Sequence, residues 1–177
     1  MSSSLNQGSG SAVKVGAKII AFALFLLLLD QLIKFFVHRH IPVIDHIHYY
    51  YPYAGIGVFK NFAGVEFSLN HMTNKGAAWG FFGDYQTPLI ILRMILIAGS
   101  ILYLFLFNER RSWQLPIVLI ISGAVGNVID FFSYGHVIDM FHFVLWGYDF
   151  PVFNIADSAI CIGIAMIFFF SWFESPS

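Results

Sequence analysis

Carboxylate and amide side chains stand at the ends of long apolar runs in this chain, and they are the first candidates for chemistry. They are Asp30, Asn127, Asp130, Asp139, Asn154 and Asp157. An ionisable group inside a membrane helix costs about 2.5 to 3.5 kcal/mol, so each one needs a partner or a function. Six polar groups from three apolar runs, all expected at one depth, indicate a site.

Two of these carboxylates suggest a specific reaction. Asp139 and Asp157 are 18 residues apart (157 − 139) and flank a loop whose ends we expect to lie close together. Two carboxylates in a partly dry place do not both ionise easily, so one keeps its proton while the other remains a base. This is the pairing used in aspartic proteolysis, in which one group activates water and the other polarises a peptide carbonyl. The chemistry needs no metal and no other cofactor.

The alternative for each polar residue is a purely structural one. Asn154 or Asp157 could cap the first turn of the helix that follows. Asn127 and Asp130 are three residues apart, share one helix face, and can both point into a bundle.

Four apolar stretches must position these groups. They are Ile19 to Val37, Pro88 to Phe107, Leu115 to Phe132 and Phe153 to Phe173. Each is long enough to cross about 30 Å of hydrocarbon at 1.5 Å per residue, and backbone groups in lipid must be satisfied internally. The sequence therefore predicts an all-α membrane protein whose four transmembrane helices form a single domain over residues 19–173.

Composition and charge support this class and limit the partners. Hydrophobic residues make up 58% of the 177 residues and charged residues 11%, and the net charge of −1 offers no basic surface for nucleic acid. Lys14, Lys18, Arg110 and Arg111 favour cytoplasmic termini. We expect residues 1–18 to form a disordered cytoplasmic tail and residues 174–177 a short one.

Two connections then share the outer face. In the loop 38–85 the segment Val65 to Asn70 alternates apolar and polar residues, which predicts a small β element. The loop 133–152 is aromatic and His-containing, which is typical of an interfacial segment. His38, His40, His46 and His48 with Asp45 have spacing that could bind a metal. Such residues are also common in an interfacial segment rich in Tyr and His, and we expect no metal site.

Other classes of function make different predictions. A transporter or channel would place polar groups in a chain across the bilayer, whereas the middles of the first and fourth apolar stretches are uniformly apolar. A non-catalytic scaffold would use Gly123 and Gly126 for helix packing and would tolerate loss of the carboxylates.

Five blocks of sequence, in order, resemble the lipoprotein signal peptidases (type II signal peptidases), which are four-helix membrane aspartyl proteases. The blocks are Asp30-Gln31-Leu32-Ile33-Lys34, Asn74-Lys75-Gly76-Ala77-Ala78-Trp79, Gly126-Asn127-Val128-Ile129-Asp130, Val137-Ile138-Asp139 and Phe153-Asn154-Ile155-Ala156-Asp157.

The resemblance implies a site and a substrate. Asp139 and Asp157 would be catalytic, and the residues that bind substrate or support the pair would be Asp30, Lys34, Asn74, Gly76, Asn127, Asp130 and Asn154. The substrates would be diacylglyceryl-modified bacterial prolipoproteins, cut just before the lipidated cysteine by a monomeric enzyme of the inner membrane, near its outer leaflet. Two positions depart from the family pattern: Phe131 stands where Arg is usual, and Met140 where Phe is usual. Either another cation replaces the missing guanidinium or its supporting role is lost.

Overall fold

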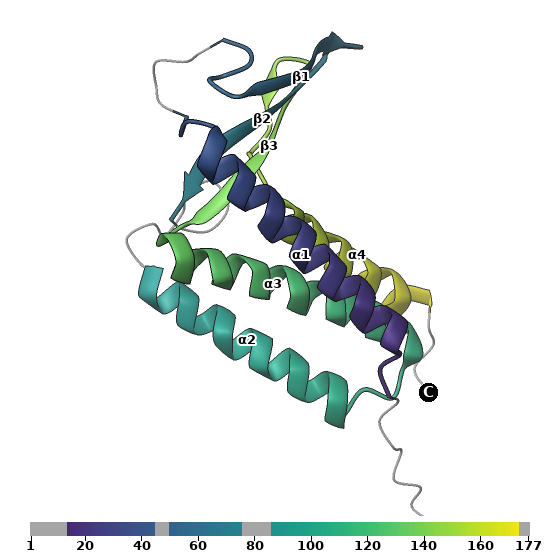
Figure 1. Ribbon diagram of the computed structural model, residues 1–177. Coiled ribbons are helices and arrows are strands. Elements are labelled where there is room, and N and C mark those ends of the chain that lie inside the picture. The colour runs from purple at the N-terminus through teal and green to yellow at the C-terminus, as the bar shows by residue number, and fades with distance from the viewer. Residues whose placement is uncertain (1–13, 45–49, 76–85, 174–177) are drawn as a thin grey trace, which may run out of the picture.

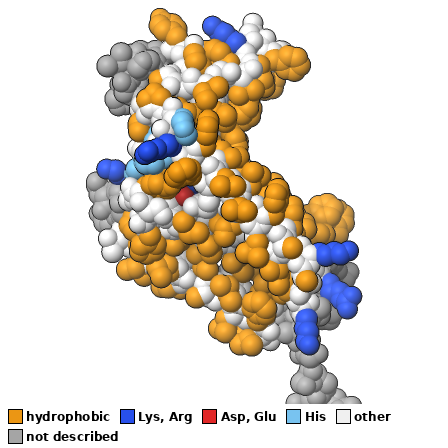
Figure 2. All heavy atoms as spheres, in the orientation of Figure 1, with side chains coloured by type: hydrophobic (Ala, Val, Ile, Leu, Met, Phe, Trp, Pro, Cys, Tyr) orange, Lys and Arg blue, Asp and Glu red, His pale blue; other side chains and the backbone are white. Residues whose placement is uncertain are grey.

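Four long helices and a small sheet make up the computed structural model, which describes residues 14–44, 50–75 and 86–173 (Figure 1). The helices are α1 (Ala17–His40), α2 (Gln86–Leu106), α3 (Gln114–Tyr134) and α4 (Ile155–Phe173). All four are long and apolar enough to cross a membrane, which confirms the predicted spans. Their outward-facing surface is covered by apolar side chains (Figure 2). Such a surface suits lipid and not water.

Helix α3 is the centre of the bundle and packs against the other three helices. Half of its most apolar stretch is buried, against 17% or less for the other helices. Small residues allow the close approach to α4, because a Cβ on Gly123 would overlap the carbonyl oxygen of Ala156. A one-turn 3₁₀ helix, η3 (Arg111–Trp113), leads into α3.

The sheet has four antiparallel strands in the order β1 (Ile56–Phe62), β2 (Val65–Asn74), β3 (Val137–Leu145) and β4 (Tyr148–Asp149). It extends beyond the end of the bundle where α1 finishes (Figure 1). The predicted β element is present as the first part of β2. The central pairing joins distant segments of the chain, from Asn74 opposite Val137 to Val65 opposite Leu145.

The segment 133–152 differs from the interfacial aromatic loop that we expected, because most of it is strand. Its backbone pairs with β2 along nine residues, Val137–Leu145, and then turns back as β4. The turn is made by Trp146 and Gly147, both with positive φ (49° and 84°), the geometry of a two-residue hairpin turn. The aromatic rings of β3 therefore pack on the sheet: the ring of Phe143 stacks on that of Phe67 with centroids 4.4 Å apart.

The junction between bundle and sheet is fixed by a short connection. Helix α3 ends at Gly135, whose left-handed φ of 76° lets its N–H donate to the Phe131 carbonyl. Strand β3 starts two residues later, and its buried Ile138 and Met140 pack with Val37 of α1 and with Ile41, which directly follows that helix. This short turn holds the beginning of β3 against the helices.

The close contact between α3 and α4 gives a test of the packing. We expect Gly123→Ala to destabilise the protein by about 1 to 3 kcal/mol, because the added methyl group must displace the α4 backbone. The matched control is Gly99→Ala on α2, where a Cβ meets no atom within 4 Å. Thermal unfolding in detergent should show a lower Tm for the first variant only. Equal melting temperatures would show that the contact is not tight.

Candidate active site

A buried ammonium group joins two helices near the sheet. Lys34 of α1 is fully buried, and its Nζ lies 2.8 Å from Asp30 Oδ2 and 2.7 Å from Asp130 Oδ2 of α3. The same nitrogen donates to Asn127 Oδ1 at 3.0 Å. Because the two carboxylates compensate the charge, the lysine is stable in a place that excludes water.

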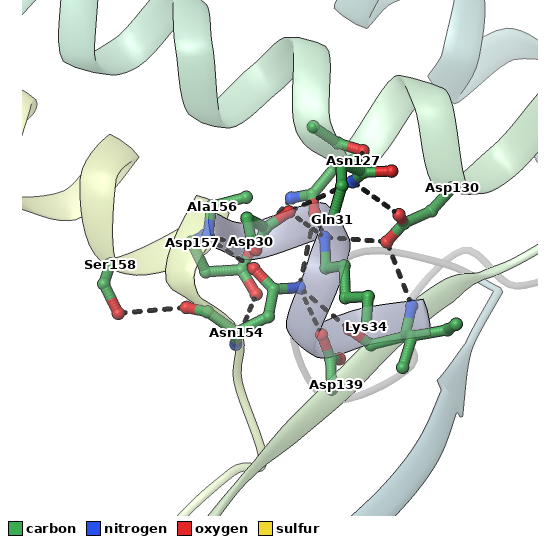
Figure 3. A network of polar contacts seen from close by, with 12 residues as sticks. Asp30, Gln31, Lys34, Asn127, Asp130, Asp139, Asn154, Ala156, Asp157 and Ser158 are labelled. Carbon is green, nitrogen blue, oxygen red and sulfur yellow. Dashed lines mark hydrogen bonds and ion pairs between the residues drawn. The ribbon is translucent and has the colours of Figure 1, made fainter. Parts of the chain in front are cut away.

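The carboxylates of this ion pair also hold backbone groups of two further elements (Figure 3). Asp30 Oδ1 accepts the N–H of Ala156 at the start of α4, at 3.0 Å. Asp130 Oδ2 accepts the N–H of Ile138 in β3, at 3.2 Å. The ion pair therefore ties α1, α3, α4 and β3 to one point.

Gln31 also belongs to the site, although it is not among the site residues predicted from the sequence. Its Nε2 donates to Asp30 Oδ2 (3.2 Å), Asp130 Oδ1 (3.0 Å) and the Gly126 carbonyl (3.2 Å). The signal was its place beside Asp30 in a block that we had already identified. Gln31 therefore bridges the two carboxylates: it shares Asp30 Oδ2 with Lys34 and binds the Asp130 oxygen that Lys34 does not contact.

Asp139 lies in β3, is 2% exposed, and accepts hydrogen bonds from two amides. Asn154 Nδ2 donates to Oδ1 at 2.7 Å, and Asn74 Nδ2 donates to Oδ2 at 3.0 Å. Burial and the nearby charge of Asp157 raise the pKa of Asp139 from 3.8 to about 7, although both amides oppose this shift. The carboxyl group is thus poised to exchange a proton near neutral pH.

Asp157 is positioned by the cap of α4. Asn154 Oδ1 accepts the N–H of Asp157 at 2.8 Å, and Asp157 Oδ2 accepts the N–H of Asn154 at 3.4 Å, which is a reciprocal capping box. Its other oxygen accepts from Asn127 Nδ2 at 2.7 Å. The capping interpretation is therefore correct, and the same cap directs Asp157 toward the site.

Asn154 connects the two candidate catalytic carboxylates. The residue is fully buried, and its side chain contacts Asp139 through Nδ2 while its backbone and Oδ1 contact Asp157. Figure 3 shows the two carboxylates on either side of this amide. The predicted residues that the structure brings together are Asp30, Lys34, Asn74, Asn127, Asp130, Asp139, Asn154 and Asp157. Gly76 lies outside the described residues.

The two departures from the family pattern have different surroundings. Phe131 is half-buried, and its ring lies 5.7 Å from that of Phe132. Met140 is fully buried in the apolar cluster with Val37 and Ile138. Among the described residues, the cation beside the carboxylates of this network is Lys34.

Comparison with known proteins shows the family to which the chain belongs. Residues 22–173 match the family described as signal peptidase (SPase) II. The lipoprotein signal peptidase of Streptococcus pneumoniae is 33% identical over 156 residues, 88% of this chain and 92% of that protein. That of Streptococcus pyogenes serotype M1 is 34% identical over 159 residues, 89% and 95% of the two chains. A bacterial membrane enzyme solved by the in meso method at 2.3 Å resolution has a TM-score of 0.74 and 27% identity, and the match covers 90% of this chain and 93% of that one.

Four helices able to cross a membrane, with a buried cluster of carboxylates and amides near one end, define a multi-pass membrane protein. The match over nearly the whole chain makes the class specific. The chain belongs to the signal peptidase II family, and it is a protease. This membership favours the peptidase interpretation over the transporter and scaffold alternatives.

The buried lysine gives a prediction for stability. Lys34→Met should lower the free energy of unfolding by about 3 to 5 kcal/mol, because it leaves two buried carboxylates without a compensating charge. Lys60→Met is the matched control, since Lys60 lies exposed on β1. Chemical unfolding in detergent measures both. Adding Asp130→Asn to Lys34→Met should restore part of the loss, and an equal effect of Lys34→Met and Lys60→Met would contradict the role of the ion pair.

Proposed function

We propose that the protein removes signal peptides from bacterial prolipoproteins whose cysteine carries a diacylglyceryl group, and that it cuts the bond just before that cysteine. Family membership supports the substrate class, since the relatives of similar sequence are lipoprotein signal peptidases. The observation that carries the chemistry is the pair Asp139 and Asp157, joined through Asn154 and set at the end of the membrane helices.

In the proposed mechanism the pair acts as an aspartyl dyad on a water molecule. The ionised carboxylate takes a proton from the water as its oxygen attacks the scissile carbonyl carbon. The protonated carboxyl donates a hydrogen bond to the carbonyl oxygen and stabilises the charge that develops there. As the tetrahedral intermediate collapses, the C–N bond breaks and the protonated carboxyl passes its proton to the leaving amine of the cysteine. The pair has gained one proton from water and given one to the amine, so it again holds a single proton.

The surroundings of the two groups suggest which one starts with the proton. Asp139 is almost completely buried, and its pKa, raised to about 7, keeps a large share of this carboxyl protonated at neutral pH, so we assign it as the initial acid. Asp157 is partly exposed and receives N–H donors from Asn127 and Asn154, which suits an ionised base. Asn154 contacts both and keeps their spacing fixed.

The position of the site fits a substrate that is anchored in lipid. The network joins α1 and α3 to the start of α4 and to β3. Apolar side chains cover the surface of the helices (Figure 2). A substrate with two acyl chains partitions into the membrane, because each buried CH₂ contributes about 0.8 kcal/mol. We propose that the scissile bond reaches the carboxylates while the acyl chains remain among the membrane lipids.

Charge at the opposite end of the bundle supports the orientation. The start of α1, with Lys18, and the turn before α3, with Arg110 and Arg111, lie at that end, and Gln114 Nε2 donates to the Lys14 carbonyl at 3.1 Å. By the positive-inside rule this end faces the cytoplasm. The termini would then be cytoplasmic and the site near the outer leaflet of the inner membrane. All the site residues come from one chain, so a monomer suffices, and the dyad needs no metal or other cofactor.

Substitution of each carboxylate tests the dyad. We expect Asp139→Asn and Asp157→Asn each to lower kcat by at least about a hundredfold, because an amide neither accepts the proton from water nor donates one to the amine. The assay is cleavage of a diacylglyceryl-modified prolipoprotein by protein purified in detergent. The control is Asp149→Asn, a carboxylate on β4 whose side chain is 77% exposed. Full activity of either dyad variant would refute the mechanism.

The pH profile gives a second test. The raised pKa of Asp139 predicts that kcat/KM falls as pH rises through about 7, where the last proton of the pair is lost, because kcat/KM reports the ionisations of the substrate-free enzyme. Rate is lost on the alkaline side because the general acid disappears, and on the acid side because the general base is protonated. The measurement is kcat/KM against pH in detergent, with Asp149→Asn showing the same curve. A rate that stays constant across the alkaline range would contradict the assignment.

A further inference from the structure

Three histidines from separate elements converge at the junction between the bundle and the sheet. They are His38 near the end of α1, His71 in β2 and His136 in the turn between α3 and β3. Each offers one ring nitrogen, and the three nitrogens lie within 4.8 Å of one another. This set differs from the group considered from sequence: His40 instead bonds the Phe36 carbonyl at 3.0 Å, and His46 and His48 lie outside the described residues.

Two of these rings have a buried nitrogen without a hydrogen-bond partner among the described residues. His71 is 3% exposed, and its Nδ1 lies 2.9 Å from the Ile41 carbonyl oxygen. A carbonyl only accepts, so Nδ1 must carry the proton, which leaves a lone pair on the unpartnered Nε2. His136 Nε2 is unpartnered too. A buried acceptor without a donor costs free energy, and one cation would satisfy the Nε2 atoms of both His71 and His136.

The donor set selects the class of ion. Three neutral imidazoles suit a divalent ion of intermediate softness, whereas calcium and magnesium prefer oxygen ligands. The contact between the His71 Nδ1–H and a backbone carbonyl is the arrangement that usually orients a metal-binding histidine. We propose that His38, His71 and His136 bind one Zn²⁺ ion, with a fourth coordination position open to water.

The geometry allows this with a small adjustment. Tetrahedral zinc with Zn–N bonds of about 2.0 to 2.1 Å places its nitrogens about 3.3 Å apart, so the rings must close in from the present spacing. His38 is exposed and free of the buried packing that fixes His71, so its side chain can make most of that movement. Histidine side chains reach the surface where the sheet meets the helices, which gives the ion a path of entry (Figure 2).

The position of the ion suggests a structural role. It would clamp the end of α1 to β2 and to the start of β3, next to the strands that carry Asn74 and Asp139. The competing interpretation is an aromatic cluster, since the His38 ring lies 4.5 Å from Tyr134 and 5.4 Å from His71, centroid to centroid. The zinc proposal does not depend on the proposed function, because binding can be measured without substrate.

Zinc binding by the purified full-length chain tests the proposal. The protein carries no polyhistidine tag, is stripped with EDTA, is transferred to metal-free detergent buffer, and competes for ZnCl₂ with a chromogenic chelator. We expect one Zn²⁺ per chain and a higher Tm with zinc than without. His38→Gln should weaken binding at least about tenfold, the loss that even an outer-shell partner causes. His40→Gln, two residues along the same helix, should bind as the wild type does.

The variants distinguish loss of a ligand from loss of the fold. His71→Gln removes a buried ring, so its Tm in EDTA is compared with that of the wild type before its zinc affinity is interpreted. His38→Gln changes an exposed side chain and should keep the Tm of the metal-free protein. Absence of stoichiometric zinc binding by the wild type would overturn the proposal, and so would equal zinc affinity of His38→Gln and His40→Gln. Either result would leave the three rings as an aromatic cluster.

Discussion

The rest of the site depends on one buried ammonium group. Lys34 has no exposed surface, and the cost of burying its charge is offset by Asp30 and Asp130 at 2.8 and 2.7 Å. Asp30 accepts an N–H at the start of α4 with its second oxygen. Asp130 accepts an N–H in β3 with the same oxygen that contacts Lys34. The need to compensate the Lys34 charge therefore sets the relative positions of the elements that carry the two candidate catalytic carboxylates. Asp157 directly follows Ala156, and Asp139 directly follows Ile138.

The residues that fold this region also prepare its chemistry. Asn154 ends the extended segment before α4 with a capping box, and the same side chain donates to Asp139. A cap and a catalytic support are usually considered as alternatives. Here the cap fixes the rotamer of Asp157, and fixing that rotamer is what a dyad needs, because a misplaced carboxylate loses the gain from orientation. In the proposed mechanism, stability and reactivity therefore depend on the same amide.

The structural features that could be predicted from the sequence are those that depend on the composition of one continuous segment. Hydropathy located the four spans, and alternation located the strand from Val65 to Asn70. The carboxylates were recognisable because charge in an apolar run is expensive wherever the chain folds. The strand Val137–Leu145 was missed, since its pairing with β2 joins segments far apart in the chain and its aromatic residues also fit an interface. The grouping of His71 with His38 and His136 was missed for the same reason, because three separate elements create it.

In the proposed function, the depth of the site reconciles two opposing demands. Hydrolysis needs water, and a substrate with acyl chains stays in hydrocarbon, so neither the middle of the bilayer nor the aqueous phase serves both. At the helix ends, a carboxyl group such as Asp139 can be buried enough for its pKa to reach about 7, while the partly exposed Asp157 remains open to water. Moving the pair toward the middle of the helices would raise the cost of ionisation and remove the water. Moving the pair outward into water, away from the helices, would restore full solvation, and the pKa of Asp139 would return toward its ordinary value.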